Sequence, residues 1–225
     1  MKIQAVLFDL DGTLVDSLED LTDAVNHMLI WFRKAPLSSS KVQSLVGKGA
    51  RNLVQRALDS HLPAEIEQGL LLFTQYNAVH IADKSRLYPG TLELLNQLLD
   101  QGLHLAIISN KQEALTRLIL EVLGIDRFFE TVCGGDTFPE MKPSPLPLFE
   151  VIGRGGFSAA EAVMVGDSIN DIRAGKDAGI TTIGCTWGYG GPGELDDADY
   201  LAGSLAEVAE VLGEKSTPSP PRPSP

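Results

Sequence analysis

Four aspartates stand where carboxylate chemistry is possible. Asp9 and Asp11 flank one leucine at the end of an apolar run, and Asp167 and Asp171 follow another such run. If these side chains converge, two carboxylates ~4 Å apart repel by about 4 kcal/mol at an effective dielectric constant of about 20, so the group needs a cation. Hard divalent cations take oxygen ligands, and Mg²⁺ is commonly held by carboxylates together with substrate phosphate. The aspartates therefore indicate a magnesium site.

Two further polar groupings could complete this site. Ser109 and Asn110 follow a third apolar run, and Lys142 stands directly before Pro143. Each of these groupings alone is typical of a capped turn. Together with the aspartates, they predict one crevice that is lined by carboxylates, a lysine and a hydroxyl group.

Three other kinds of binding site do not fit the spacing. A calcium-binding hand loop needs glycine at its sixth place and glutamate at its twelfth, unlike the segment that begins at Asp9. The Gly47–Gly49 segment is too short for a nucleotide-binding P-loop. The histidines have no metal-ligand spacing and are interpreted as surface or packing residues: His27, His61, His80 and His104.

Apolar runs and turn signals predict the elements that position these groups. Residues 3–10 form a short run with β-branched members, which predicts a buried strand that ends at Asp11 and Gly12. The elements predicted after residue 90 alternate: strands at 103–109, 131–133, 162–165 and 181–185, with helices at 92–101, 112–123 and from about 145 and 170. Such alternation indicates an α/β fold, a doubly wound parallel sheet of the Rossmann-like type. Ligands bind outside the carboxyl ends of such strands, where the polar groupings fall.

Residues 17–84 carry helical periodicity and no convincing strand. Ser17 and Asp20 match a capping box, a second helix follows the loop at residues 47–49, and a third begins at Pro63. This block is an insert after the first strand, so the predicted domains are an α/β core at 1–16 and 85–213 and a helical cap at 17–84. The Pro- and Ser-rich residues 214–225 are predicted to be a disordered tail.

Composition excludes several classes of protein. The net charge of −12 argues against a nucleic-acid-binding surface. No apolar run reaches the roughly 20 residues needed to span a bilayer. The first residues do not resemble a signal peptide, so we expect a cytoplasmic protein with no membrane partner. Cys133 and Cys185 lack metal or redox spacing and are interpreted as reduced, buried residues. The sequence leaves the oligomeric state open.

The ordered motifs resemble those of the haloacid dehalogenase superfamily of phosphatases. The segment from Phe8 to Leu14 with Asp16 and Ser17 is similar to the first motif. The other three motifs follow in the right order: Ser109-Asn110, Lys142-Pro143 and the segment 166–171. The resemblance covers residues 1 to about 212 and implies a Mg²⁺-dependent phosphomonoester hydrolase of the α/β class.

The resemblance also implies a role for each motif residue. Asp9 is the nucleophile that forms an aspartyl-phosphate, and Asp11 is the general acid and base. Ser109, Asn110 and Lys142 bind the phosphoryl group. Asp9, the Asp11 carbonyl and Asp167 ligate Mg²⁺, and Asp171 supports either Lys142 or the metal.

The insert most closely resembles the cap of the phosphoglycolate phosphatase group, through the segments 46–50 and 53–58. The substrate implied is a small metabolite, with 2-phosphoglycolate as the first choice. Lys48 and Arg51 lie in a glycine loop ahead of a predicted helix, where they could bind a carboxylate of the substrate. We therefore expect them to determine substrate selectivity.

Other functions share these motifs. A phosphosugar mutase or a sugar-phosphate phosphatase of the same superfamily would have the same core. A dehalogenase would lack the second carboxylate that Asp11 provides, and a phosphonate hydrolase would need a cap lysine in a setting that neither Lys41 nor Lys48 matches. From a different class, the chain could be a non-catalytic phosphate-binding regulatory module, since fold alone does not imply function.

Overall fold

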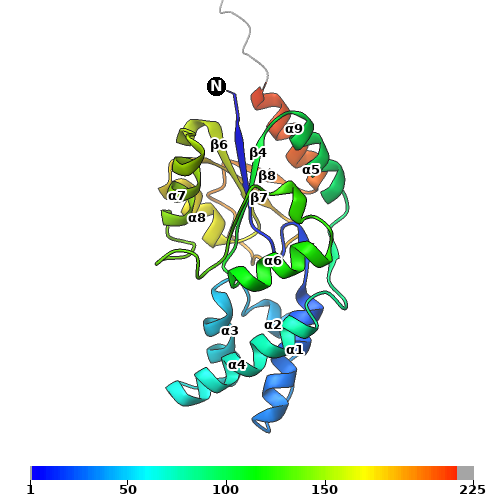
Figure 1. Cartoon of the computed structure of the whole chain (residues 1–225). Coiled ribbons are helices and arrows are strands. Elements are labelled where there is room, and N and C mark those ends of the chain that lie inside the picture. The colour runs from blue at the N-terminus through cyan, green and yellow to red at the C-terminus, as the bar shows by residue number, and fades with distance from the viewer. Residues whose placement is uncertain (1, 217–225) are drawn as a thin grey trace, which may run out of the picture.

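The structure is a computed structural model that describes residues 2–216. Its core is a six-stranded sheet in which every neighbouring pair is parallel. The strands lie in this order: β5 (Thr131–Cys133), β4 (His104–Ile108), β1 (Ala5–Phe8), β6 (Ala162–Gly166), β7 (Thr181–Cys185) and β8 (Tyr200–Ala202). The predicted fold class, an α/β protein with a parallel sheet, is confirmed (Figure 1).

Helices cover both faces of the sheet, which is why the central strands are apolar throughout. Side chains alternate between faces along a strand, so Val6 and Phe8 of β1 join one buried cluster, while Ala5 and Leu7 join the other. The first cluster is covered by α5 (Thr91–Asp100), α6 (Glu113–Val122) and α9 (Leu205–Ser216). The second is covered by α7 (Leu146–Gly155) and α8 (Ile169–Asp177) (Figure 1). Short 3₁₀ turns lie at Asp126–Phe128 and Ala159–Glu161.

Strand order creates a crevice at the carboxyl end of β1. The chain passes from β1 to β4 and β5 on one side, then returns to β6, β7 and β8 on the other side. Phe8 is in register with Ile107 of β4 and Val165 of β6, so the residues that follow these strands meet at one edge. Ligands of open parallel sheets bind at such a switch point.

Between β1 and β4 the chain forms a helical block with its own apolar core. Its helices are α1 (Leu18–Trp31), α2 (Ser39–Gln43), α3 (Gly49–Leu58) and α4 (Pro63–Val79). They surround a cluster that includes Leu21, Val25, Leu53 and Phe73. The block lies at the end of the sheet beside α6 (Figure 1). Two antiparallel strands, β2 (Val15–Asp16) and β3 (Arg86–Leu87), pair where the chain enters and leaves the block. We keep residues 17–84 as the proposed extent of the cap.

Several local predictions differ from the structure. Ser17 precedes α1 without a side-chain capping bond, because its hydroxyl donates to Asp11, while the Asp20 carboxylate accepts from Lys84 and Ser85. The predicted capping box is therefore wrong. Helices α2 and α9 and strand β8 were not predicted. Since α9 runs to Ser216, the predicted start of the tail at residue 214 falls inside a helix, and residues 217–225 of that tail lie outside the described residues. In the part of the chain that the structure describes, no helix has the length and hydropathy to cross a membrane.

Candidate active site

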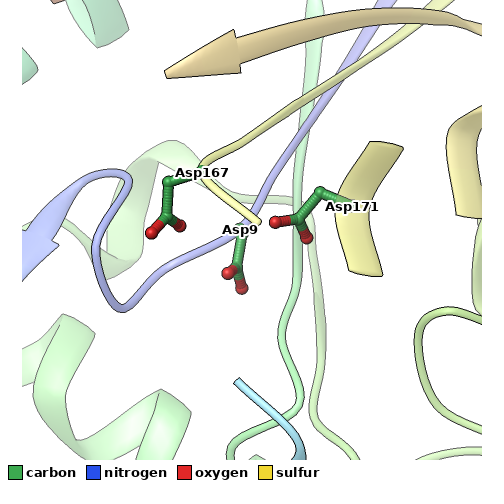
Figure 2. A group of neighbouring side chains, drawn as sticks. All are labelled: Asp9, Asp167 and Asp171. Atoms are coloured by element: carbon green, nitrogen blue, oxygen red, sulfur yellow. The ribbon is translucent and has the colours of Figure 1, made fainter. Parts of the chain in front are cut away.

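Three aspartates converge at the carboxyl ends of the central strands. Asp9 follows β1, Asp167 follows β6 and Asp171 lies in the first turn of α8. Each offers a carboxylate oxygen, and these oxygens all lie within 4.8 Å of one another. Figure 2 shows the side chains of Asp167 and Asp171 on either side of that of Asp9. This oxygen-only donor set is the kind that a hard divalent cation takes.

Asp167 is held rigidly in this cluster. Its carboxylate accepts hydrogen bonds from the Thr13 hydroxyl at 2.9 Å and from the Tyr189 backbone N–H at 2.6 Å. The turn after β1 passes so close that a Cβ on Gly12 would lie 2.4 Å from the Asp167 carboxylate, and Gly12 has a φ of +91°. Only glycine fits there, because a side chain would clash with Asp167 and because other residues rarely adopt this positive φ. Tyr189 is a site residue that sequence reasoning missed.

Lys142 bridges two of the aspartates. Its buried ammonium lies 3.0 Å from Asp9 and 2.5 Å from Asp171. The second carboxylate oxygen of Asp171 accepts from the backbone N–H and the hydroxyl of Ser168, at 3.0 and 2.8 Å. Burial lowers the pKa of Lys142, but the carboxylates of Asp171 and Asp9 outweigh burial and leave this pKa above its usual value. Lys142 is therefore a charged group in a fixed position.

One lysine does not balance the carboxylates. Burial raises the pKa of Asp9 from 3.8 to about 6; Lys142 opposes this rise and Asp171 adds to it. Burial, with the charges of Asp9 and Asp171, raises the pKa of Asp167 from 3.8 to about 8. Full ionisation of the Asp9 and Asp167 carboxyl groups at neutral pH therefore needs additional positive charge. A divalent cation among these oxygens would supply it, so the residues fit such an ion.

Two cavities reach the aspartates from the side of the helical block. The smaller has a volume of about 60 Å³, and the larger about 560 Å³. Asp9, Asp11 and Gly47 line both of them. Ser109 and Lys142 line the smaller cavity, with apolar walls from the helical block at Leu21, Ala50, Leu53 and Phe73. Both cavities are therefore closed partly by the sheet and partly by the helical block.

Asn110 lies in the site, but its side chain does something other than predicted. Its amide nitrogen donates to the Gly47 carbonyl at 2.9 Å and to the Lys142 carbonyl at 2.8 Å. An amide nitrogen has two hydrogens, so neither is left for phosphate. The Asn170 amide also donates to Gly47, at 3.1 Å. Asn110 and Asn170 thus hold the loop before α3 against the core, and the prediction that the Asn110 side chain binds phosphate has no support here.

Asp11 has a basic partner that sequence reasoning missed. The Lys111 ammonium lies 3.2 and 3.3 Å from the two carboxylate oxygens of Asp11, and the Lys111 side chain is only 7% exposed. The Ser17 hydroxyl donates to Asp11 at 2.6 Å. Lys111 directly follows Ser109 and Asn110 in the sequence, and that position was the available signal.

The two basic residues predicted for selectivity lie in different places. Lys48 lines the larger cavity. Arg51 lines neither cavity and instead pairs with Glu67 of α4, both side chains being exposed. Successive residues of a helix point about 100° apart, so with Ala50 facing the smaller cavity, Arg51 faces α4. The structure does not bring Arg51 to the site.

Comparisons with known proteins agree with this arrangement. Residues 6–185 match the family model described as haloacid dehalogenase-like hydrolase. A phosphoglycolate phosphatase of Neisseria meningitidis serogroup A is 43% identical over 220 residues, which cover 93% of this chain and 94% of that one. One from Chromobacterium violaceum is 40% identical over 215 residues, covering 93% and 96%. A crystal structure described as a predicted phosphoglycolate phosphatase from Haemophilus somnus 129pt superposes with a TM-score of 0.90 at 33% identity, covering 94% and 98%.

Proposed function

The chain belongs to the haloacid dehalogenase-like hydrolase family, and on this basis we propose that it hydrolyses the phosphomonoester of 2-phosphoglycolate by way of an aspartyl-phosphate on Asp9. The phosphatase class rests on relatives that carry that name and that match this chain over nearly their whole length. The catalytic assignment rests on one observation: Asp9 lies at the end of a central strand, beside a buried lysine, and lines both cavities.

In the first step, an oxygen of Asp9 attacks phosphorus and the bond to the substrate oxygen breaks. The leaving alkoxide takes a proton from Asp11, which lines the same cavities. In the second step, Asp11 removes a proton from water, which attacks the aspartyl-phosphate and restores Asp9. A covalent step divides a very high barrier, and acid–base assistance contributes typically 10²–10⁴-fold.

The phosphoryl oxygens carry negative charge that must be stabilised during the reaction. Lys142 supplies a full positive charge at a fixed position, and the Ser109 hydroxyl supplies a neutral donor. Asp171 supports the lysine, because Lys142 and Ser168 already occupy its oxygens. We assign Mg²⁺ binding to the carboxylates of Asp9 and Asp167 and the carbonyl of Asp11. When bound, Mg²⁺ would neutralise charge on the phosphoryl group.

A measurement of phosphate release tests this proposal. Purified protein is assayed with a panel of phosphorylated metabolites, with Mg²⁺ and after exhaustive chelation. We expect Mg²⁺-dependent turnover with the highest kcat/KM on 2-phosphoglycolate. Turnover that is highest on a hexose phosphate would replace the substrate but keep the chemistry. No turnover of any ester would contradict the enzymatic proposal itself.

A further inference from the structure

A buried amide in the helical block has an unused donor. Asn77 of α4 is 2% exposed and lines the smaller cavity. Among residues 2–216, no hydrogen-bond acceptor lies within reach of its amide nitrogen. Buried polar groups in folded proteins are nearly always paired, because an unpaired donor destabilises the fold. An unpaired amide that lines a cavity is therefore a position where a ligand would supply the missing acceptor.

A buried cation lines the same cavity from the core side. The Lys111 ammonium is almost fully enclosed, and the Asp11 carboxylate is the anion that it contacts. The two oxygens of that carboxylate lie 3.3 and 3.2 Å from the ammonium. A lysine ammonium has three hydrogens and no acceptor, so Lys111 can donate to a second anion as well. An anionic group of the substrate in this cavity would be such an anion.

Asn77 and Lys111 come from opposite sides of the cap–core junction. On α4, Thr74 lies one helical turn before Asn77, and its hydroxyl is 3.5 Å from the side-chain oxygen of Gln112, the residue after Lys111. One end of this stretch of α4 therefore lies close to the segment that carries Lys111, and Figure 1 shows the helical block on the side of the sheet where α6 lies. The phosphate-binding groups proposed above, Ser109 and Lys142, line the same cavity.

The size of the cavity limits what can bind. It has a volume of about 60 Å³, against about 560 Å³ for the cavity that Lys48 lines. The smaller space favours a compact group. A short carboxylate is compact, and its oxygens can accept from both the Asn77 amide and the Lys111 ammonium.

We propose that Asn77 and Lys111 together bind the carboxylate of the substrate and so select phosphate esters of short hydroxy acids. This inference rests on the phosphatase function proposed above, and it identifies the residues that recognise the part of the substrate other than its phosphate. Lys111 donates to the substrate carboxylate while keeping its contact with Asp11, and Asn77 donates its unused amide hydrogens. The sequence favoured Lys48 and Arg51 for this role. Lys48 lines the larger cavity, and Arg51 lines neither cavity.

Two substrates that differ at one group test the proposal. Ethyl phosphate has a methyl group where 2-phosphoglycolate has its carboxylate. We expect the parent enzyme to prefer 2-phosphoglycolate in kcat/KM by at least ~100-fold, the scale of two hydrogen bonds to a charged group. Lys111→Met should reduce this preference about 30-fold and Asn77→Leu about 10-fold. Arg51→Met, a basic residue of the same region outside both cavities, should keep the preference.

Stability separates a binding role of Asn77 from a structural one. Because its amide is unpaired, Asn77→Leu should raise the thermal unfolding midpoint of the substrate-free protein while it lowers selectivity. Asn77→Asp keeps the shape but adds a negative charge, and it should reduce the preference further. A lowered midpoint for Asn77→Leu with an unchanged preference in Asn77→Asp would show that the amide is structural.

The outcomes distinguish this inference from the proposed function. If the parent enzyme prefers 2-phosphoglycolate and both Lys111→Met and Asn77→Leu keep that preference, the carboxylate site is refuted and the function stands. If the parent enzyme hydrolyses both esters equally, the proposed substrate is wrong and the carboxylate site is wrong with it. If only Arg51→Met loses the preference, a residue on the exposed face of α3 determines selectivity and the carboxylate site is refuted.

Discussion

At the residue scale, Asp9 combines features that oppose one another. Its carboxylate is largely buried beside two other acids, which favours the protonated form, and beside Lys142, which favours the charged form. A nucleophile must be ionised, so the residue depends on its cationic neighbours. The same crowding that raises its pKa also places its oxygens next to the groups that we propose bind phosphate.

Replacing Asp9 tests whether it carries the covalent step. Asp9→Asn keeps the side-chain shape but removes the attacking oxygen, so we expect kcat to fall by roughly 10⁴-fold or more. The circular dichroism spectrum should remain that of the parent protein. Acid quenching of the parent enzyme during turnover, followed by peptide mapping, should find phosphate on Asp9. Near-normal turnover by the asparagine variant would exclude the mechanism.

Lys142 and Ser109 should differ in importance because only one is charged. Lys142→Ala removes the charge that faces the phosphoryl group and leaves Asp9 and Asp171 without their cation, so kcat/KM should fall by about 10³-fold. Ser109→Ala removes one neutral donor and should cost about 10-fold to 100-fold. The comparison is of kcat/KM on one substrate at saturating Mg²⁺. Equally small losses from both variants would place phosphate elsewhere.

At the element scale, the loop between α2 and α3 joins the cap to the catalytic edge of the sheet. The Gly47 carbonyl receives hydrogen bonds from Asn110, which follows β4, and from Asn170 in the first turn of α8. Both donors belong to segments that also carry proposed phosphate or metal residues. Positioning of the cap is therefore coupled to the same strand ends that form the candidate active site.

Removing one of these two bonds should loosen the cap without touching the phosphate. Asn170→Ala is expected to lower kcat/KM on 2-phosphoglycolate about 2- to 10-fold, the range for one hydrogen bond. Asn96→Ala, on the exposed side of α5, serves as a matched control, because its amide donates only within its own helix at Leu92. Hydrogen exchange of residues 44–50 should increase in the Asn170 variant alone. Unchanged exchange and activity would mean that Asn110 suffices to hold the loop.

At the scale of the whole molecule, the site holds carboxylates whose mutual repulsion a bound divalent cation would relieve. The chain has a formal net charge of −12, and within residues 2–216 three carboxylates gather at Asp9, Asp167 and Asp171. Buried carboxylates without a cation favour protonation, so folding of the metal-free protein takes up protons. The stability of the entire fold should thereby depend on pH and on any cation that these carboxylates bind.

This linkage has a definite sign. The folded-state pKa of Asp9 is raised from 3.8 to about 6, and that of Asp167 from 3.8 to about 8. Between pH 3.8 and pH 8, therefore, the folded state binds more protons than the unfolded chain. The unfolding free energy of the metal-free protein should therefore fall, by a few kcal/mol, as pH rises from about 4 to about 8.

Urea unfolding with chelator at several pH values measures this fall. Mg²⁺ should remove most of it by binding only the folded state. The double variant Asp9→Asn, Asp167→Asn should show a flatter pH profile and no stabilisation by Mg²⁺. A metal-free stability that rises across this range would contradict the assignment of these two acids.

Much of the fold and of the catalytic edge could be predicted from local sequence patterns. Alternating apolar runs and turns predicted the parallel sheet, because strand and helix periodicities are properties of short segments. Asp9, Ser109 and Asp167 lie at or just beyond the carboxyl ends of predicted strands, and parallel strands bring these ends to one edge. Short or atypical segments such as β8 and α2 were missed, because three to five residues carry too little periodicity.

The sequence by itself thus determined the fold class, the family and the set of acids and lysine at the strand ends. Tertiary structure alone decided how the cap meets that edge. Asn110 donates to Gly47, 63 residues away, and Lys111 contacts Asp11, 100 residues away. Likewise, α4 presents Asn77 to the cavity and Arg51 turns toward Glu67. Such contacts depend on how one packed domain sits against another, and no local spacing of residues encodes that relation.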